Sequence, residues 1–130
     1  MGLFDRLLNH TAVDSRSFEQ KLADILQSAG SYELRKKISI DELEQQYGQL
    51  WNRNRSYALP EAISYAVCVN GAPVLYIRLW NDYGRYSRVA NREIKQFCDT
   101  YGVKVLDFFD YLPNRADYMA ERITANLPRF

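Results

Sequence analysis

Two runs rich in β-branched and aromatic residues, Tyr65–Val69 and Ala72–Trp80, meet at Asn70-Gly71. Asn-Gly tolerates the positive φ angles of a tight type I′ turn, so the stretch predicts an antiparallel hairpin with a two-residue turn. The expected cross-strand pairs are Val69 with Ala72, Val67 with Val74, and Tyr65 with Tyr76.

The hairpin sorts its side chains onto two faces, because side chains alternate along a strand with period two. One expected face is aromatic and ends in charged residues: Glu61, Ile63, Tyr65, Val67, Val74, Tyr76, Arg78 and Trp80. The other is small and aliphatic, as suits a packed helix: Ser64, Ala66, Cys68, Leu75, Ile77 and Leu79. A site on this hairpin is expected at the charged end of the aromatic face.

Helical periodicity predicts the elements around the hairpin. Ser17 and Gln20 form a capping box that opens a helix ending at Ala29. Asp41 is the expected cap of a second helix, and Asn114 of the last one. The expected helices are 17–29, 41–50, 87–101 and 115–125, and the further strands are 31–40 and 103–109. Residues 2–9 form a short amphipathic piece, interpreted as a first helix packing on the domain rather than a membrane anchor, since its only basic residue is Arg6.

These elements predict one α/β (α+β) domain over residues 1–130, with no linker or repeat. Residues 1–16 are a helical extension, 17–109 the core and 110–130 the C-terminal helix. The order is α-β-(α)-β-hairpin-α-β-α, with a mixed sheet of about four strands flanked by helices. The strand–helix–strand step after the hairpin predicts a parallel pair with a right-handed crossover.

Composition narrows the class of protein. Of 130 residues, 47% are apolar and 25% charged, with a formal net charge of +1, which is typical of a globular chain. No apolar run reaches the ~20 residues that span a bilayer, and no signal-peptide layout is present, so we expect a cytoplasmic protein without a membrane partner. Cys68 and Cys98 are expected as buried reduced thiols without zinc-ligand spacing, and His10 as a surface residue.

The element order resembles the core of the restriction endonuclease-like superfamily, the PD-(D/E)XK nucleases. The likeness runs from about Ser17 to Phe109. Its first half is carried by Phe18-Glu19, Leu22, Leu26 and Gly30, which are similar to a first helix with a glutamate near its start. Its second half is carried by the hairpin, the basic helix after it, and Gly102-Val103-Lys104-Val105.

The resemblance implies a metal site that this sequence has lost. Members of the family hold Mg²⁺ between two carboxylates on the hairpin, with a lysine two residues past the second acid. Pro60-Glu61 resembles the P-D element, but Arg78 stands where the second acid is expected and Trp80 where the lysine is expected. An arginine cannot ligate a metal. We therefore expect a degenerate site at Glu61, Arg78 and Trp80, with no metal or cofactor.

A relocated nuclease site is the alternative. Glu19 would supply the second acid from the first helix, with Asp82 nearby and Lys95 as the amine, although Lys95 falls opposite the apolar stripe of its helix. Only in this case would Mg²⁺ be required.

Basic residues favour a binding function. Arg85, Arg88, Arg92 and Lys95 recur on one side of a predicted helix, and Arg53 and Arg55 lie in an irregular segment. They would contact phosphates of a nucleic acid, whereas Glu93, Asp99 and the low net charge favour a merely solvated surface.

Aromatic content favours a third function, a module that binds a protein partner or forms a homodimer. The chain has ten tyrosines and two tryptophans. The tyrosines expected in or near loops and helix ends are Tyr83, Tyr86, Tyr111 and Tyr118. The sequence thus predicts an inactive nuclease-like domain that binds nucleic acid or protein.

Overall fold

The computed structural model describes residues 14–48, 63–80 and 85–128, with the side chains of residues 85–91 and 93 outside that description. The elements in chain order are α2 (Phe18–Ala29), β1 (Glu33–Ile38), α3 (Ile40–Tyr47), β2 (Ile63–Val69), β3 (Ala72–Trp80), α4 (Arg85–Tyr101), β4 (Val105–Phe109) and α5 (Ala116–Asn126). The predicted α/β order is therefore confirmed, while the segment 2–9 lies outside the described residues.

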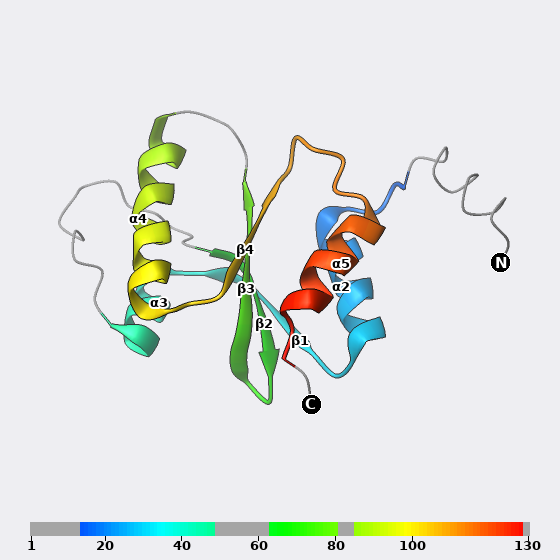
Figure 1. Ribbon diagram of the computed structural model, residues 1–130, viewed down its shortest axis with the longest axis horizontal. Coiled ribbons are helices and arrows are strands. Elements are labelled where there is room, and N and C mark those ends of the chain that lie inside the picture. Colours follow the sequence, from blue (N-terminus) through cyan, green and yellow to red (C-terminus); the bar gives the residue numbers. More distant parts are fainter. Residues whose placement is uncertain (1–13, 49–62, 81–84, 129–130) are drawn as a thin grey trace, which may run out of the picture.

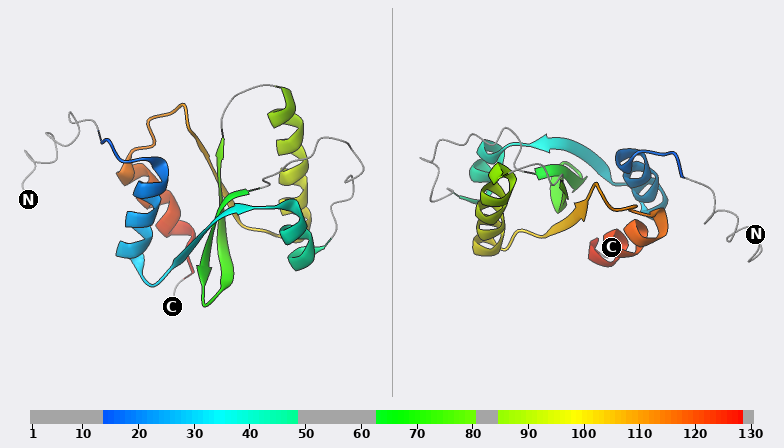
Figure 2. Two further views of the ribbon diagram at one scale, coloured as in Figure 1. Left: turned by 180° about the vertical axis from the view of Figure 1, so that it is seen from behind. Right: turned by 90° about the horizontal axis from the view of Figure 1, so that it is seen from above.

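The four strands form one mixed sheet in the order β1-β2-β3-β4. β1 and β2 pair antiparallel, as do β2 and β3, whereas β3 and β4 run parallel. Helices α3 and α4 lie on one side of this sheet, and α2 and α5 on the other (Figure 1). The view from above shows the same three layers (Figure 2). The predicted parallel step through α4 is confirmed.

Local signals explain most helix boundaries. The Ser17 hydroxyl accepts a hydrogen bond from the Gln20 backbone N–H and opens α2, as predicted. The other two predicted caps are wrong. Ser39, rather than Asp41, caps α3 because its hydroxyl is placed to accept from the N–H of Glu42.

At α5 the N-cap is Arg115, which makes no side-chain cap hydrogen bond. The Asn114 side chain is directed elsewhere and donates to the carbonyls of Phe109 and Leu112. Its amide is therefore used to close the β4–α5 turn, and this explains why it does not cap the helix.

The hairpin has the predicted turn but an unpredicted β-bulge. Val69 pairs with Ala72 as expected, and Asn70 and Gly71 both have positive φ, at 50° and 79°. Beyond the turn Cys68 pairs with Pro73, whereas Val67 pairs with Leu75, so Val74 is an extra residue on β3.

The bulge overturns the predicted grouping of faces, because one extra residue exchanges the sides of everything beyond it. Tyr65 and Val67 pack in the layer of α2 and α5, whereas Tyr76 packs in the layer of α3 and α4. Pro73 has no backbone N–H to donate to the hydrogen-bond ladder between β2 and β3. The bulge beside it therefore has a local cause.

The sheet separates two apolar cores, and each is closed by one helix layer. The first contains Ile38, Leu43, Ile63, Ala66, Cys68, Tyr76, Ile94, Phe97, Cys98 and Val103. The second contains Leu22, Leu26, Val67, Leu75, Ile77, Leu106, Phe108, Met119, Ile123 and Leu127. Both cysteines are free and buried, as predicted. A functional side chain on the sheet therefore belongs to one helix layer or the other.

Candidate functional site

The parallel pair β3–β4 places four polar and aromatic side chains together. Arg78 pairs with Asp107 in register, and Trp80 pairs with Phe109. These positions alternate with Ile77, Leu79 and their partners on β4, which fill the α2–α5 core, so they project toward α4. In open sheets with parallel strands, ligands bind beyond the carboxyl ends of the strands, and this is where these residues lie.

Trp80 links the two charges on this face. The guanidinium carbon of Arg78 lies 4.2 Å from the centre of the Trp80 ring, a cation–π arrangement. The indole Nε1 of Trp80 donates a hydrogen bond of 3.0 Å to Asp107 Oδ1. Arg78 and Asp107 are thus held in fixed positions relative to one rigid ring.

A pocket of about 160 Å³ lies between α4 and the β3–β4 pair. We call it the α4–sheet pocket, and its lining residues are Arg78, Trp80, Ile94, Lys95, Cys98, Val105, Asp107 and Phe109. Among the described residues that line it, Arg78 and Lys95 are cations and Asp107 is a carboxylate.

Burial changes the titration of two groups in the α4–sheet pocket. It lowers the pKa of the Arg78 guanidinium, although Asp107 acts in the opposite direction. An arginine remains protonated at neutral pH despite this shift. Burial raises the pKa of the Cys98 thiol to about 11, against the weaker opposite effect of Arg78. Cys98 is therefore a neutral thiol at physiological pH and a poor nucleophile.

Aromatic side chains continue outward from the α4–sheet pocket. The ring centre of Phe109 lies 6.2 Å from that of Trp80 and 5.5 Å from that of Tyr111. Exposure rises along this row, from a half-buried Trp80 to Phe109 at 37% and Tyr111 at 60%. Leu112 beside them is 48% exposed. We call Trp80, Phe109 and Tyr111 the aromatic row.

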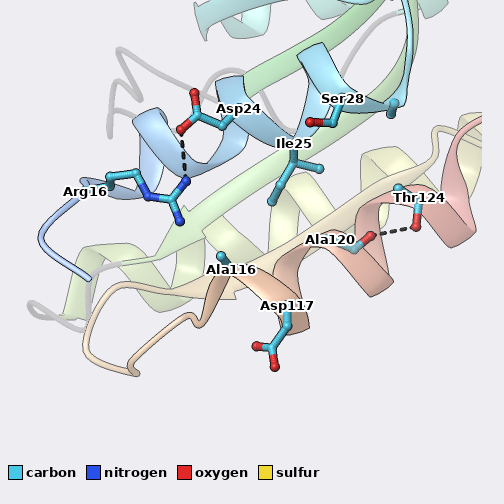
Figure 3. A pocket seen from close by; sticks show the side chains of 9 residues that line it. Arg16, Asp24, Ile25, Ser28, Ala116, Asp117, Ala120 and Thr124 are labelled. Carbon is cyan, nitrogen blue, oxygen red and sulfur yellow. Dashed lines mark hydrogen bonds and ion pairs between the residues drawn. The ribbon is translucent and has the colours of Figure 1, made fainter. Parts of the chain in front are cut away.

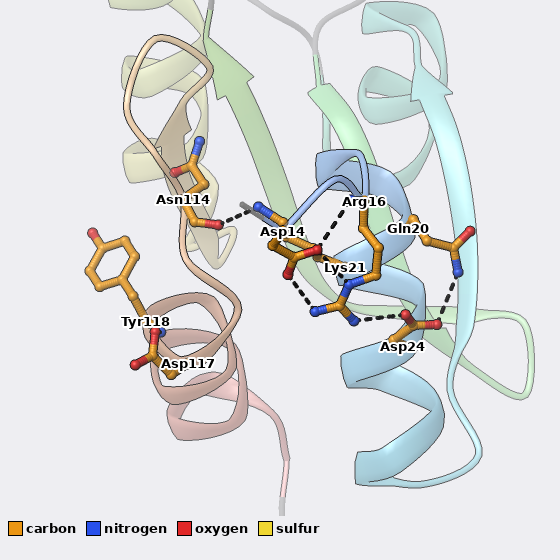
Figure 4. A network of polar contacts seen from close by, with 8 residues as sticks. All are labelled: Asp14, Arg16, Gln20, Lys21, Asp24, Asn114, Asp117 and Tyr118. Carbon is orange, nitrogen blue, oxygen red and sulfur yellow. Dashed lines mark hydrogen bonds and ion pairs between the residues drawn. The ribbon is translucent and has the colours of Figure 1, made fainter. Parts of the chain in front are cut away.

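A hydrogen bond from α2 holds the loop that carries Tyr111 in place. Lys21 on α2 is only 7% exposed, and its ammonium donates a 3.0 Å hydrogen bond to the Asn114 carbonyl. Figure 4 shows this bond crossing from α2 to the segment before α5, beside the Asp14–Arg16–Asp24 ion pairs. The Asn114 amide donates in turn to the carbonyls of Phe109 and Leu112. The exposed end of the aromatic row thus has a defined position.

Glu19, the acid of the relocated nuclease hypothesis, lies on the opposite side of the sheet. Its carboxylate forms a 2.9 Å ion pair with Lys36 on β1 and accepts a 3.4 Å hydrogen bond from the Tyr65 hydroxyl. Lys95 lines the α4–sheet pocket in the other layer. The structure therefore does not bring Glu19 and Lys95 together, although it does bring Arg78, Trp80 and Lys95 together.

The other predicted site residues divide into those with described side chains and those without. Arg92 and Lys95 are exposed on α4, as the helical spacing indicates. Arg85 and Arg88 lie on the same helix, but their side chains are outside the described part of the structure. Glu61, Arg53, Arg55 and Asp82 also lie outside the described residues.

No cluster of three or more acidic, histidine or cysteine side chains suited to a metal ion occurs within residues 14–48, 63–80 and 85–128. A second hollow, of about 450 Å³, lies between α2 and α5 (Figure 3). Small side chains such as Ala116, Ala120 and Ser28 line it, with Arg16 and Asp24 at one end (Figure 3). Its charged lining residues are Arg16, Asp24 and Asp117, and Arg16 is already paired with Asp24.

Sequence reasoning missed Asp107, Phe109 and Lys21. The signal for the first two was present, because the parallel pairing of the strands was predicted and Asp107 and Phe109 alternate along the second strand. Counting register from the strand ends could have placed them beside Arg78 and Trp80. Lys21 carries no such signal, since its role depends on contact with a loop 93 residues later.

No known protein family, curated protein or solved structure shows significant similarity to this chain. Across the described segments, every helix is too short or too polar to cross a lipid bilayer.

Proposed function

We propose that the protein is a non-catalytic, restriction endonuclease-like domain that binds single-stranded nucleic acid at the carboxyl ends of β3 and β4. The observation that carries this proposal is the aromatic row, which begins beside two pocket cations, Arg78 and Lys95. Proteins that bind single strands combine stacking rings with a positively charged path for the backbone.

The restriction endonuclease-like relationship is supported by topology alone. The helix, the antiparallel hairpin, the helix and the returning parallel strand follow in the order that suggested the family. The non-catalytic part is supported by chemistry. Glu19 is paired with Lys36 and lies on the other side of the sheet from Lys95, so the acid and the amine of a relocated site are far from each other.

The nucleic-acid part is supported by the combination of rings and charges. Each base that stacks on an exposed ring contributes about 1–3 kcal/mol with little dependence on sequence. Phe109 and Tyr111 offer such rings, and Arg92 and Lys95 on α4 lie exposed for contact with phosphates. Because the formal net charge is only +1, attraction to phosphates would have to come from a local group of cations rather than from the whole molecule.

Fluorescence anisotropy with a 12-nucleotide strand labelled at an internal base tests the proposal. We expect binding that weakens steeply between 50 and 200 mM salt, as counterion release requires. Tyr111→Ala should lower the affinity about tenfold, because one stacked base is lost. Tyr118→Ala is the matched control, since Tyr118 is 48% exposed but its ring lies against Phe108 of the other core. Equal affinity of the two variants would refute the role of the aromatic row.

The exposed apolar residues also support a second candidate, a protein-binding module. Phe109, Tyr111 and Leu112 are large apolar side chains gathered on one turn, as anchors of protein interfaces often are. A module that binds only a protein partner would not bind the labelled strand, so the same titration separates the two candidates.

A calorimetric titration with Mn²⁺ tests the nuclease alternative. We expect no saturable binding to the wild-type protein. Saturable binding that is lost in Glu61→Ala would establish a working metal site and would overturn the non-catalytic proposal.

A further inference from the structure

We propose that the hollow between α2 and α5 is the docking site for residues 2–9 of the same chain, which bind there as a short helix. We call this hollow of about 450 Å³ the α2–α5 hollow. The inference does not depend on nucleic-acid binding. It is carried by the lining of the hollow, by the apolar stripe of the segment and by the point at which the described chain begins.

Small side chains from two helices form the floor of the α2–α5 hollow (Figure 3). Ala116 and Ala120 on α5 and Ile25 on α2 are half-buried, and Ile25 packs against the core beneath. The distance between packed helices depends on the side chains at their contact, so small side chains let a further helix come close. The hollow thus has the form of a seat for a helix.

Several polar groups around the α2–α5 hollow are already used within the protein. The Thr124 hydroxyl donates a 2.7 Å hydrogen bond to the Ala120 carbonyl of its own helix. The Arg16 guanidinium pairs with Asp14 at 2.6 Å and with Asp24 at 2.9 Å (Figure 4). An occupant that brings apolar side chains therefore suits this lining better than one that brings charges.

Residues 2–9 supply such an apolar face, although they lie outside the described residues. In a helix their apolar side chains share one side, whereas Asp5 and Arg6 fall away from it. The apolar residues are Leu3, Phe4, Leu7 and Leu8. Isolated helices shorter than about 12–15 residues are marginal in water, so a helix of this length needs a surface to pack against.

The length of the chain matches this assignment. The first described residue, Asp14, is paired with Arg16 at one end of the hollow, and only residues 10–13 lie between it and the segment. Four residues reach about 14 Å at most. A helix over residues 2–9 would be about 12 Å long, which equals the rise along α5 from Ala116 to Thr124.

The short connection also decides which copy of the segment binds. A segment joined to its site by a few residues has an effective concentration in the millimolar range, above that of a second copy at ordinary protein concentrations. The segment would enter at the Arg16 end and run along the hollow, so that its apolar stripe covers Ala120 and Ile25. The proposed occupant is therefore the segment of the same chain.

Hydrogen–deuterium exchange of the full chain, measured by mass spectrometry of the peptide that contains residues 2–9, tests the inference. Ala120→Arg places a long charged side chain in the hollow. We expect residues 2–9 to exchange at least about tenfold more slowly in the wild type than in this variant. Glu121→Arg is the matched control, because Glu121 is the next residue, is exposed and is not a lining residue. It should exchange as the wild type does.

A second variant keeps the test valid if Ala120→Arg fails to fold, which the exchange of β2 and β3 in the same sample reveals. Ser28→Arg obstructs the hollow from an exposed position on α2, and exposed Gln27→Arg is its control. On the segment itself, Leu7→Asp should remove the slow exchange, whereas Asp5→Asn should keep it, because only Leu7 belongs to the apolar stripe.

Each other outcome overturns the inference. Equally fast exchange of residues 2–9 in the wild type and in the hollow variants would show that the segment is not docked. Slow exchange that survives both Ala120→Arg and Ser28→Arg would place the segment elsewhere on the protein. Slow exchange that disappears on about tenfold dilution would assign the hollow to the segment of a second copy.

Discussion

The indole of Trp80 lies between a guanidinium and a carboxylate, with the Arg78 guanidinium carbon 4.2 Å from its ring centre and its Nε1 3.0 Å from Asp107 Oδ1. Arg78 and Asp107 are also direct neighbours in the register of β3 and β4. The Trp80 ring therefore contacts a cation on its own strand, β3, and an anion on β4.

We predict that Trp80→Phe destabilises the protein by about 1–2 kcal/mol, because phenylalanine keeps an aromatic face but leaves Asp107 without its donor. Urea unfolding measures the loss. A double-mutant cycle with Asp107→Ala, which removes the acceptor, should give a coupling energy of at least about 0.5 kcal/mol. Strictly additive losses would mean that the hydrogen bond contributes nothing.

Asn114 gives a prediction about the turn before α5. Its φ is +38°, and its amide donates to two carbonyls of the β4–α5 turn. Asn114→Gly keeps access to positive φ and loses only the hydrogen bonds, whereas Asn114→Ala loses both. We expect losses of about 1 kcal/mol for glycine and about 2 kcal/mol for alanine in thermal or urea unfolding. If alanine proved no worse than glycine, the backbone conformation would not contribute.

The buried phenol of Tyr76 should make the protein less stable at alkaline pH. Burial, reinforced by the hydrogen bond from Tyr47, raises the pKa of the Tyr76 phenol well above its usual value. The unfolded chain loses this proton near pH 10, while the native state keeps it. The contribution of the neutral Tyr76 phenol to the free energy of unfolding is therefore fully present below pH 10 and is lost as the pH rises further.

The free energy of unfolding should therefore fall between pH 10 and 11 more steeply in the wild type than in Tyr76→Phe. The difference in slope should approach about 1.4 kcal/mol per pH unit. Urea titrations at both pH values test this, and parallel slopes for the two proteins would contradict it.

The two thiols should be inert in the native protein. Cys68 is fully buried and Cys98 is 2% exposed, and burial raises the pKa of Cys98 to about 11. At pH 8 we expect a disulfide reagent to react about two orders of magnitude more slowly than with the chain in urea, because little thiolate forms. Single Cys→Ser variants assign the residual rate. Rapid modification of native Cys98 would show that α4 opens from the sheet.

The sequence predicted those parts of the fold that depend on local signals. The Ser17 cap and the apolar spacing of α2 are contained within a few residues, and so is the Asn70-Gly71 turn. The parallel β3–β4 step followed from a general rule of chain connection. These predictions needed no knowledge of distant contacts.

Predictions failed where neighbouring residues allow two local arrangements. The Asn114 side chain had two uses, as a cap or as a bridge within the preceding turn, and the carbonyls of Phe109 and Leu112 decided between them. The faces of the hairpin failed because one extra residue at the bulge inverts every assignment beyond it. For the same reason the aromatic side chains of β2 and those of β3 were expected in one cluster and belong to two.

The bulge has a consequence for how this chain can change during evolution. Removal of Val74 would pair Pro73 and Leu75 with Cys68 and Val67 as consecutive neighbours, and would restore an uninterrupted ladder. The base of the hairpin and the register with β4 would keep their present partners, and the α2–α5 core would lose only Val74, a half-buried side chain packed against it. Descendants of this sequence can therefore gain or lose a residue at this position without reassigning any buried side chain, and length variation within the hairpin is expected here first.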